Sequence, residues 1–375
     1  MKNKSKTKKL AILGASYLQV PLIEKAKSFG VMTHCFAWEE GAVAKDIADF
    51  FYPISVTKKE LILEKCQQIG IDGIVTIATD LPVPTISFIA QKMKLIGNSV
   101  KSAFISTNKM AMRNAFQANG LPIPTYFDEN NLFANINFNF PLIVKPTDRS
   151  GSRGVNIVSS KEELLTAIQN AKDISLTKEV IIESYIKGRE ISVETISYKG
   201  NHQILAYTDK VTTGPPHFVE LEHHQPAKLS NSIIERVDEI TLASLDALEI
   251  TNGASHVELK IAEDGDIYII EVGARMGGDF IGSHLVQLST GFDYLKAVID
   301  VALDCSPDES MPISASKYKS GVLFNCSMNK DKNTRFSNIR NYYIIEQVLA
   351  EPFKSSFTNS NDRAGYQIYQ IRNNV

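Results

Sequence analysis

The 375-residue sequence lacks the patterns that mark several common protein classes. Its four cysteines are far apart and form no C-x-x-C pair, so neither a disulfide framework nor a cysteine zinc site is expected. Reduced thiols of a cytoplasmic protein are the default. There is no run of about 18 apolar residues, which a membrane-spanning helix requires. The net charge of −2 argues against a nucleic-acid groove or a polybasic membrane surface.

The N-terminus has one feature of a secretory signal and lacks the others. Residues 2–9 are rich in lysine, and residues 10–20 are largely apolar. However, Gly14 and Gln19 interrupt the apolar stretch, Pro21 follows it, and no A-x-A cleavage site appears. We therefore expect a solvated tail followed by a first β-strand.

Residues 1–105 alternate between short apolar strands and amphipathic helices, which predicts a Rossmann-like parallel α/β domain. No G-x-G-x-x-G fingerprint follows the first strand, so a nicotinamide dehydrogenase is weakly supported. The domain would instead supply a crevice at its strand ends for a small substrate, or only a wall. The expected strands are Lys9–Leu13, Val31–Phe36, Phe51–Ile54 and Gly73–Thr76, and the expected helices are Val20–Phe29, Lys58–Ile69 and Val83–Met93.

The stretch Gly253–Gly278 predicts a β-hairpin that carries two acids. Asp-Gly between apolar runs indicates a two-residue turn at Asp264-Gly265, with Glu263 facing Asp266. Opposed carboxylates repel each other, and a hard divalent cation with oxygen ligands would stabilise such a pair. The competing interpretation is an exposed hairpin whose acids point into water. The register expected from this turn gives the pairs Glu258–Glu271, Val257–Val272, Leu259–Ile270 and Ile261–Tyr268.

Several cations precede this hairpin in the sequence. Lys109 lies in the first turn of an expected helix, Thr107–Asn119, where a positive charge opposes the helix dipole and is suited to an anion. Lys145 ends an expected strand and precedes a Gly/Ser-rich loop that can turn backbone N–H groups toward one phosphate. The loop is not a Walker A motif, because no helix opens with G-K-[ST]. Its candidate phosphate-binding residues are Ser150, Gly151, Ser152 and Gly154.

Two further stretches have candidate binding residues. Glu183 and Glu190 bracket a connector between two strands, a spacing that suits contacts with a purine amino group and with ribose hydroxyls. Residues 212–226 are expected to form a long irregular loop, and long loops in compact domains are often functional. The loop has three histidines that would act in a substrate lid or, as the alternative, bind zinc: His217, His223 and His224.

In this order the motifs resemble the ATP-grasp superfamily over about residues 8–300, in its carboxylate–amine ligase and carbamoyl-phosphate-synthase-like branch. The resemblance implies an N-terminal Rossmann-like α/β domain followed by two α+β subdomains that sandwich ATP. The ATP-grasp domain would span residues 106–305, with a small lid subdomain at about 138–187. Residues 306–375 would form an appended α+β segment.

The resemblance also implies a role for each candidate residue. Lys109, Lys145 and the loop Ser150–Gly154 would hold the ATP phosphates. Arg275 would stabilise the transferring phosphoryl group. The remaining roles are adenine contacts by Glu183, Ser184 and Ile186, a ribose contact by Glu190, Mg²⁺ (or Mn²⁺) ligation by Glu258 and Glu271, and substrate contacts by His217, Gly277 and Gly278.

The implied activity is an ADP-forming carbon–nitrogen ligase. It would phosphorylate a small-molecule carboxylate to an acyl phosphate, which an amine, such as that of an amino acid, then attacks. The alternatives are a bicarbonate-activating carboxylase that forms carboxyphosphate and a nucleotide-binding regulatory module without turnover. Neither a nucleic acid nor a membrane is an expected partner, and many family members are homodimers. One departure from the family is Gly273, where many members have an asparagine that binds a second metal ion.

Overall fold

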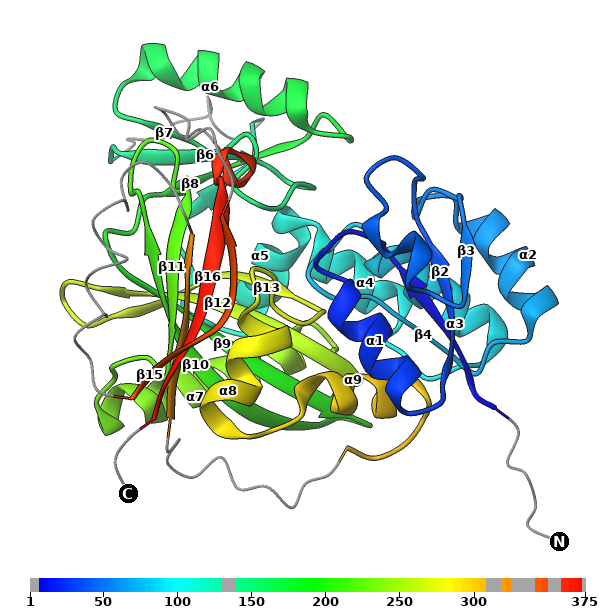
Figure 1. Cartoon of the computed structure of the whole chain (residues 1–375). Coiled ribbons are helices and arrows are strands. Elements are labelled where there is room, and N and C mark those ends of the chain that lie inside the picture. Colours follow the sequence, from blue (N-terminus) through cyan, green and yellow to red (C-terminus); the bar gives the residue numbers. More distant parts are fainter. Residues whose placement is uncertain (1–6, 130–138, 308–317, 325–340, 350–358, 373–375) are drawn as a thin grey trace, which may run out of the picture.

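The structure is a computed structural model of the chain (Figure 1), which describes residues 7–129, 139–307, 318–324, 341–349 and 359–372. Three sheets organise these residues: a four-stranded parallel sheet, an eight-stranded sheet and a second four-stranded sheet. The mixed α/β architecture predicted from the sequence is confirmed. None of the helices in these ranges has the length and apolar character needed to span a bilayer.

The N-terminal sheet is parallel, with the strand order β3-β2-β1-β4. Its first strand is buried on both faces, because Leu10 and Ile12 face one core while Ala11 and Leu13 face another. Helix α1 covers one face, and α2 and α3 cover the other. The elements are β1 (Lys9–Leu13), α1 (Val20–Ser28), β2 (Met32–Phe36), η1 (Val43–Asp46), β3 (Phe50–Tyr52), α2 (Lys59–Ile69), β4 (Gly73–Val75) and α3 (Val83–Met93).

The small subdomain expected at about residues 138–187, which we call the lid, contains an antiparallel sheet with the order β5-β8-β6-β7 that is covered by one helix (Figure 1). Its strand β5 lies outside the expected range. The helix, α6 (Lys161–Ile174), begins where the Ser160 hydroxyl accepts a hydrogen bond from the Glu163 backbone N–H. Its buried residues recur at helical spacing and face the sheet. The strands are β5 (Tyr126–Phe127), β6 (Leu142–Pro146), β7 (Asn156–Val158) and β8 (Val180–Ser184).

The eight-stranded sheet is antiparallel throughout, with the order β13-β12-β9-β10-β11-β14-β16-β15. The three C-terminal strands therefore continue this sheet, although residues 306–375 were expected to form an appended unit. Parts of that segment lie outside the described residues. The strands are β9 (Gly188–Tyr198), β10 (Asn201–Thr212), β11 (Glu220–Gln225), β12 (Gly253–Ala262), β13 (Ile267–Gly273), β14 (Tyr318–Phe324), β15 (Tyr342–Leu349) and β16 (Gly365–Arg372).

Residues 212–226 were predicted to form one long irregular loop, and this prediction is wrong. Strand β11 occupies residues 220–225, and only residues 213–219 connect it irregularly to β10. The prediction failed because Glu220–Gln225 is almost entirely polar and therefore has none of the apolar alternation that marks a strand. Its backbone pairs with β10 on one side and β14 on the other.

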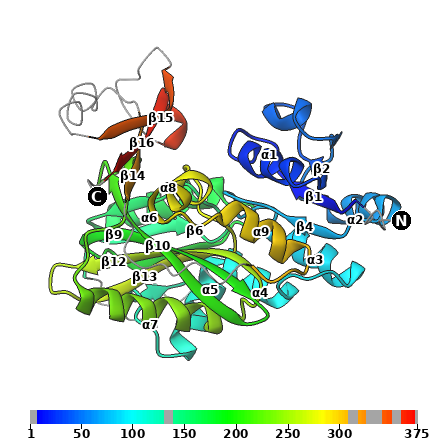
Figure 2. The same cartoon turned by 60° about the horizontal axis from the view of Figure 1, so that its bottom comes forward.

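Helices cover both faces of the central sheet (Figure 2). Helices α5 and α7 pack on one face and α8 and α9 on the other. The short α4 has no counterpart among the predicted helices, and it packs against α3 and α5. These elements are α4 (Val100–Thr107), α5 (Lys109–Ala118), α7 (Asn231–Ala247), η2 (Ile281–Leu285), α8 (Val286–Thr290), α9 (Tyr294–Ala302) and the short η5 (Ser360–Asp362).

Helix α9 joins the N-terminal domain to the central sheet, because its residues belong to one core with β1, α1 and β9. At Gly73 the approach is so close that an added Cβ would lie 2.1 Å from the carbonyl oxygen of Ala302. A backbone atom cannot move aside as the end of a flexible side chain can. The absence of a side chain at Gly73 therefore allows α9 to pack directly on β4.

We expect Gly73→Ala to destabilise the protein by about 2–3 kcal/mol, because the new methyl group forces β4 and α9 apart. Urea unfolding followed by circular dichroism measures the change. Gly278→Ala is the matched control, since its added Cβ would meet its nearest neighbour, the Ala78 carbonyl oxygen, at 3.4 Å. Equal stability of the two variants would contradict the packing described here.

Candidate active site

A cleft of about 620 Å³ lies where the three sheets meet. The loops after β1 and β4 line it from the N-terminal domain, and these strands flank the point where the strand order of the parallel sheet reverses. Strands β6 and β8 line it from the lid, and β12 and β13 line it from the central sheet. Residues 359, 360 and 363 complete its wall. Its size is in the range of ligand and cofactor sites.

The hairpin of β12 and β13 places Glu258 directly opposite Glu271, as predicted. The predicted pair Val257–Val272 is also confirmed, and both valines are fully buried on the opposite face. The two carboxylates line the cleft. The interpretation as an exposed hairpin is therefore wrong.

The turn of this hairpin differs from the prediction. The Ala262 backbone N–H donates to the Asp266 carbonyl oxygen (2.8 Å), so the turn has three residues and Gly265 adopts a φ of 90°. This turn shifts the register by one residue, and a β-bulge next to Glu258 shifts it back. Three predicted pairs are consequently wrong: Glu263–Asp266 at the turn, and Leu259–Ile270 and Ile261–Tyr268 within the strands.

A lysine neutralises each of the two opposed acids. The Lys109 Nζ lies 2.9 Å from Oε1 of Glu271, and the Lys210 Nζ lies 2.5 Å from Oε1 of Glu258. Lys210 is only 7% exposed and also lies 2.7 Å from Glu220 and 3.4 Å from Glu190. Burial alone would lower the pKa of Lys210, but the three carboxylates raise it well above its usual value. One buried ammonium therefore holds together acids from three strands.

Lys145 and Glu183 meet in the wall of the cleft, where the lid faces helix α5. The Lys145 Nζ lies 2.7 Å from Oε2 of Glu183, and the Arg113 Nε lies 2.8 Å from Oε1 of the same carboxylate. Burial opposes ionisation of Glu183, but the two cations lower its pKa to about 2. Glu183 is thus a buried acceptor with a permanent charge, and Lys145 is fixed beside it.

The connector between the lid and the central sheet also contributes to the cleft. Ser184, Ile186 and Glu190 all line it. The Ile186 carbonyl oxygen accepts a hydrogen bond from the Lys260 Nζ (3.3 Å). The Lys260 ammonium also lies over the ring of Tyr185, 5.0 Å from its centroid. An aromatic ring, a cation and backbone acceptors therefore lie side by side in this part of the cleft.

The Gly/Ser loop forms part of the cleft wall. Ser150, Gly151 and Ser152 line the cleft, and Gly151 and Ser152 have positive φ angles of 67° and 55°. Gly154, at φ 77°, packs against Pro146 and is not a lining residue. The Lys109 Nζ donates a hydrogen bond to the Arg149 carbonyl oxygen (2.6 Å), which joins the loop to Glu271.

Arg275 forms a two-point ion pair with Asp80 of the N-terminal domain. The Nε–Oδ1 distance is 2.8 Å and the Nη2–Oδ2 distance is 2.9 Å. This pair explains why residue 273 has no side chain. A Cβ on Gly273 would lie 2.9 Å from Asp80 Oδ1 and 3.0 Å from Arg275 Cζ. An asparagine could not occupy this position without displacing the pair.

His256 and Glu194 form a buried pair behind the two metal-ligand candidates. His256 Nδ1 hydrogen-bonds to Glu194, and its Nε2 lies 3.2 Å from Oε1 of Glu258. The other Glu194 oxygen accepts a hydrogen bond from the Gly277 backbone N–H (2.9 Å). Burial disfavours the imidazolium, but the carboxylates raise the pKa of His256 to about 9. A protonated His256 therefore holds Glu258 in place.

Two of the predicted substrate contacts are not supported by this geometry. Gly277 lies against the buried pair, since its added Cβ would be 2.4 Å from Glu194 Oε1, and it does not line the cleft. His217 is exposed and also lies outside the lining, whereas Phe218 contributes to it. Gly278 does line the cleft, opposite Ala78.

Sequence reasoning missed several charged residues of the site. Some of them occur singly within strands or a helix, where a lone charge normally indicates a solvated face, and Asp80, Asp279 and Arg363 lie in loops. The only signal in the sequence was a charged residue in a segment whose other residues have the apolar spacing of a buried strand or helix. The missed residues are Asp80, Arg113, Glu194, Lys210, Glu220, His256 as a partner of Glu258, Asp279 and Arg363.

Comparisons with known proteins find relatives of this chain. A family model described as an ATP-grasp domain matches residues 138–283. The D-alanine–D-alanine ligase of Trichlorobacter lovleyi is 28% identical over 221 residues, which are 55% of this chain and 68% of that protein. The carbamoyl phosphate synthase large chain of Thermoanaerobacter sp. is 24% identical over 280 residues, which are 73% of this chain but 25% of that protein.

The solved structure of the L-amino acid ligase from Bacillus licheniformis has the same fold. It matches with a TM-score of 0.79 at 21% identity, over 98% of this chain and 94% of that one. The family match therefore identifies an ATP-grasp domain over residues 138–283. The relatives that the chain resembles in sequence include D-alanine–D-alanine ligases and carbamoyl phosphate synthase large chains.

We expect His256 to be protonated at pH 7.5 in the nucleotide-free protein and to titrate near pH 9, because Glu194 and Glu258 stabilise the imidazolium. Glu194→Gln should move the pKa toward 6.5. The raised pKa contributes stability that is complete below pH 6.5 and is lost as the pH rises through 9. Nitrogen-15 NMR measures the titration.

A His256→Gln variant assigns the signal in this titration. Urea unfolding should show the largest stability difference between the wild type and Glu194→Gln below pH 6.5, and a smaller one at pH 9 and above. A wild-type pKa at or below 6.5 would refute the role given to this pair.

Proposed function

We propose that the protein is an ATP-dependent, ADP-forming carbon–nitrogen ligase. It activates a carboxylate as an acyl phosphate for attack by an amine, such as that of an amino acid. One observation supports this proposal more strongly than the others do. In a ligand-sized cleft, two directly opposed carboxylates are each neutralised by a buried lysine, Glu271 by Lys109 and Glu258 by Lys210.

The acid pair fits a divalent cation. Both residues offer only oxygen donors, which suit Mg²⁺, with Mn²⁺ as the alternative. Their side chains remain 23% and 26% exposed, in the cleft, so oxygens are accessible there. Glu258 and Glu271 would hold the ion, and its chemistry would be to neutralise phosphate charge. Lys109 could then turn to the phosphate oxygens, since the ion would neutralise Glu271 in its place, while Lys210 would stay paired with Glu190 and Glu220.

The remaining lining residues fit the parts of ATP. Lys145 and the loop Ser150–Gly154 would hold phosphates through a point charge and backbone N–H groups. Glu183, Ser184 and Ile186 would contact adenine. Glu190 would bind ribose hydroxyls. Arg113, which faces Glu183 but is buried behind it, would act by keeping that carboxylate ionised and in position.

Arg275 would serve the phosphoryl transfer itself. A substrate carboxylate oxygen attacks the γ-phosphorus, the bond to ADP breaks, and negative charge develops on the transferred group. A guanidinium that Asp80 already holds in place needs no reorganisation to stabilise this charge. The amine then attacks the acyl carbon, loses a proton, and phosphate leaves.

The substrates would bind at the end of the cleft formed by the N-terminal domain. The loops after β1 and β4 and the backbone at Gly278 line this end. Trp38 lines it as well and is 51% exposed, so an apolar group of a substrate could cover its ring. The connector at residues 213–219 would lie over the nucleotide, since Phe218 and Tyr185 are neighbouring rings in the lining.

An ADP-release screen with mass spectrometry of the products tests this function. Purified protein would be given ATP and Mg²⁺ with pairs of amino acids and other carboxylates, with and without bicarbonate. ADP release that needs both a carboxylate and an amine, with an amide product, is the expected result. ADP release with bicarbonate alone would favour the carboxyphosphate type. Binding of ATP without ADP release from any pair would favour a regulatory module.

We expect Glu271→Gln to lower kcat by about 100-fold or more, roughly 3 kcal/mol, because a neutral amide binds the cation weakly. The fold should persist, since the Glu271 side chain is 26% exposed and glutamine keeps its volume. Steady-state ADP release measures the loss. Glu263→Gln, in the exposed turn of the same hairpin, is the control and should keep full activity. Unchanged turnover in Glu271→Gln would refute the metal assignment.

A further inference from the structure

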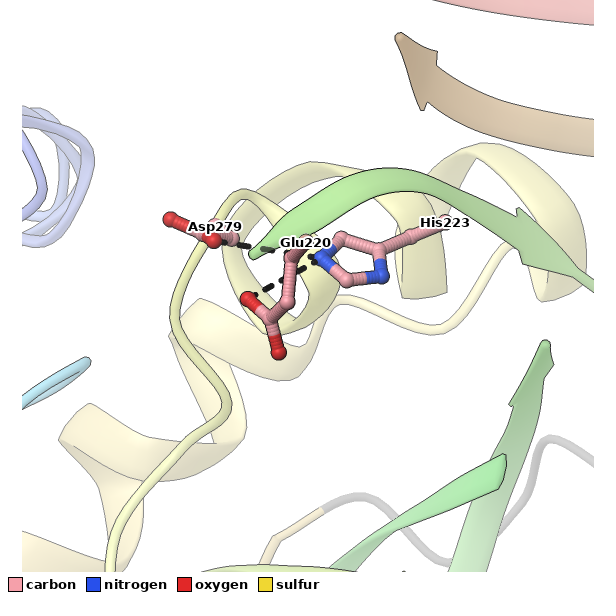
Figure 3. A group of neighbouring side chains, drawn as sticks. All are labelled: Glu220, His223 and Asp279. Carbon is pink, nitrogen blue, oxygen red and sulfur yellow. Dashed lines mark ion pairs between the residues drawn. The ribbon is translucent and has the colours of Figure 1, made fainter. Parts of the chain in front are cut away.

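A second group of potential metal ligands lies beside the proposed ATP site. Glu220 and His223 come from strand β11, and Asp279 comes from the loop after β13 (Figure 3). One ligand atom from each residue lies within 4.8 Å of the other two. Glu220 and Asp279 line the cleft, and His223 lies fully buried behind them. None of the three has a role in the proposed reaction.

The imidazole of His223 points between the two carboxylates without hydrogen-bonding to either. Its Nε2 lies 3.6 Å from Glu220 Oε2 and 3.9 Å from Asp279 Oδ2. Both distances exceed the 2.7–3.2 Å of an ordinary N–H···O bond. Neither ring nitrogen has a hydrogen-bond partner in the part of the chain that the structure describes. A buried polar group left in this state is costly, and it indicates a missing partner.

We propose that Glu220, His223 and Asp279 bind a divalent transition-metal cation. Ligands that share one such ion at about 2.1 Å lie roughly 3–3.5 Å apart. The separations of 3.6 and 3.9 Å from the imidazole nitrogen are close to this spacing, and the two carboxylate oxygens, which lie within 4.8 Å of each other, would have to move closer together. One imidazole nitrogen and two carboxylate oxygens suit Zn²⁺, Co²⁺ or Mn²⁺ better than Mg²⁺, which prefers oxygen ligands alone.

The neighbouring cations leave the ligand atoms accessible. Lys210 pairs with Oε1 of Glu220, whereas Oε2 is the oxygen that faces His223. Arg363 binds both oxygens of Asp279, at 2.6 and 3.0 Å, and each carboxylate oxygen has a second lone pair. Arg363 also stacks on Phe324, 3.8 Å from the ring centroid, which holds Asp279 in place. The two cations lower the affinity for a metal ion but do not occupy its position.

This cluster revises the zinc hypothesis drawn from the three histidines of residues 212–226. Adjacent residues of a strand point to opposite faces, so His224 turns away from His223. The His224 ring instead contacts Tyr369 Oη at 2.6 Å and Glu222 Oε2 at 2.8 Å. His217 is exposed on the preceding connector. Only His223 of the three takes part, and its co-ligands are acids.

Titration of the nucleotide-free, full-length protein with Co²⁺ alone tests the site, because ligation of Co²⁺ produces visible absorption bands. We expect one ion to bind in the absence of ATP. His223→Ala should weaken binding by at least about tenfold, because it removes a ligand. Glu220→Gln should also weaken Co²⁺ binding. This variant keeps the side-chain volume, so it replaces His223→Ala if that variant does not fold.

His217→Gln removes an exposed histidine and is the matched control, and Glu271→Gln tests the other acid pair. Both controls should bind Co²⁺ as the wild type does.

Absence of Co²⁺ binding by the wild type would overturn this inference, as would unchanged binding in both ligand variants. Loss of binding in Glu271→Gln but not in His223→Ala would also overturn it, because the ion would then occupy the ATP site. The inference is independent of the proposed ligase activity. ADP release by a protein that binds no Co²⁺ without nucleotide would refute only the second site.

Discussion

The buried ammonium of Lys210 is the interaction on which the centre of the molecule depends. Its strand, β10, lies between β9 and β11 in the sheet, and β12 follows β9. Each of these three neighbours contributes one acid to the same face: Glu190, Glu220 or Glu258. Three carboxylates so close together would repel one another strongly in a low-dielectric setting. A single cation between them offsets this repulsion, so that the three acids can lie together on one face of the sheet.

The cleft exists because separate parts of the chain are held against this sheet. Helix α9 shares its core with the N-terminal domain, and Asp80 of that domain holds Arg275. Arg363, close to the C-terminus, holds Asp279 of the loop after β13. At Gly73 a backbone carbonyl comes too close for any side chain, and at Gly273 a side chain would displace the ion pair of Asp80 and Arg275. The contacts that fix the relative placement of the domains therefore also fix the geometry of the candidate site.

Prediction succeeded where the signal was local. Alternating apolar strands and helices with stop signals identified the N-terminal domain, and the hairpin pattern put Glu258 opposite Glu271. The same local reasoning failed at the hairpin turn, because a three-residue turn and a compensating bulge cannot be distinguished from a regular two-residue turn by the sequence pattern. It failed at β11 because that strand is polar, and its place in the sheet depends on pairing with β10 and β14.

The sequence by itself determined the mixed α/β class of fold and the acids, lysines and arginine that suggest phosphoryl transfer. These features follow from periodicity, turn residues and residue type, which the chain carries at every position. Only the tertiary structure decided which charges meet. Lys210 with its three acids, Arg113 with Glu183, Asp80 with Arg275 and His223 with Asp279 join residues that are distant in the chain. Such contacts depend on strand order and domain packing, so no local pattern encodes them.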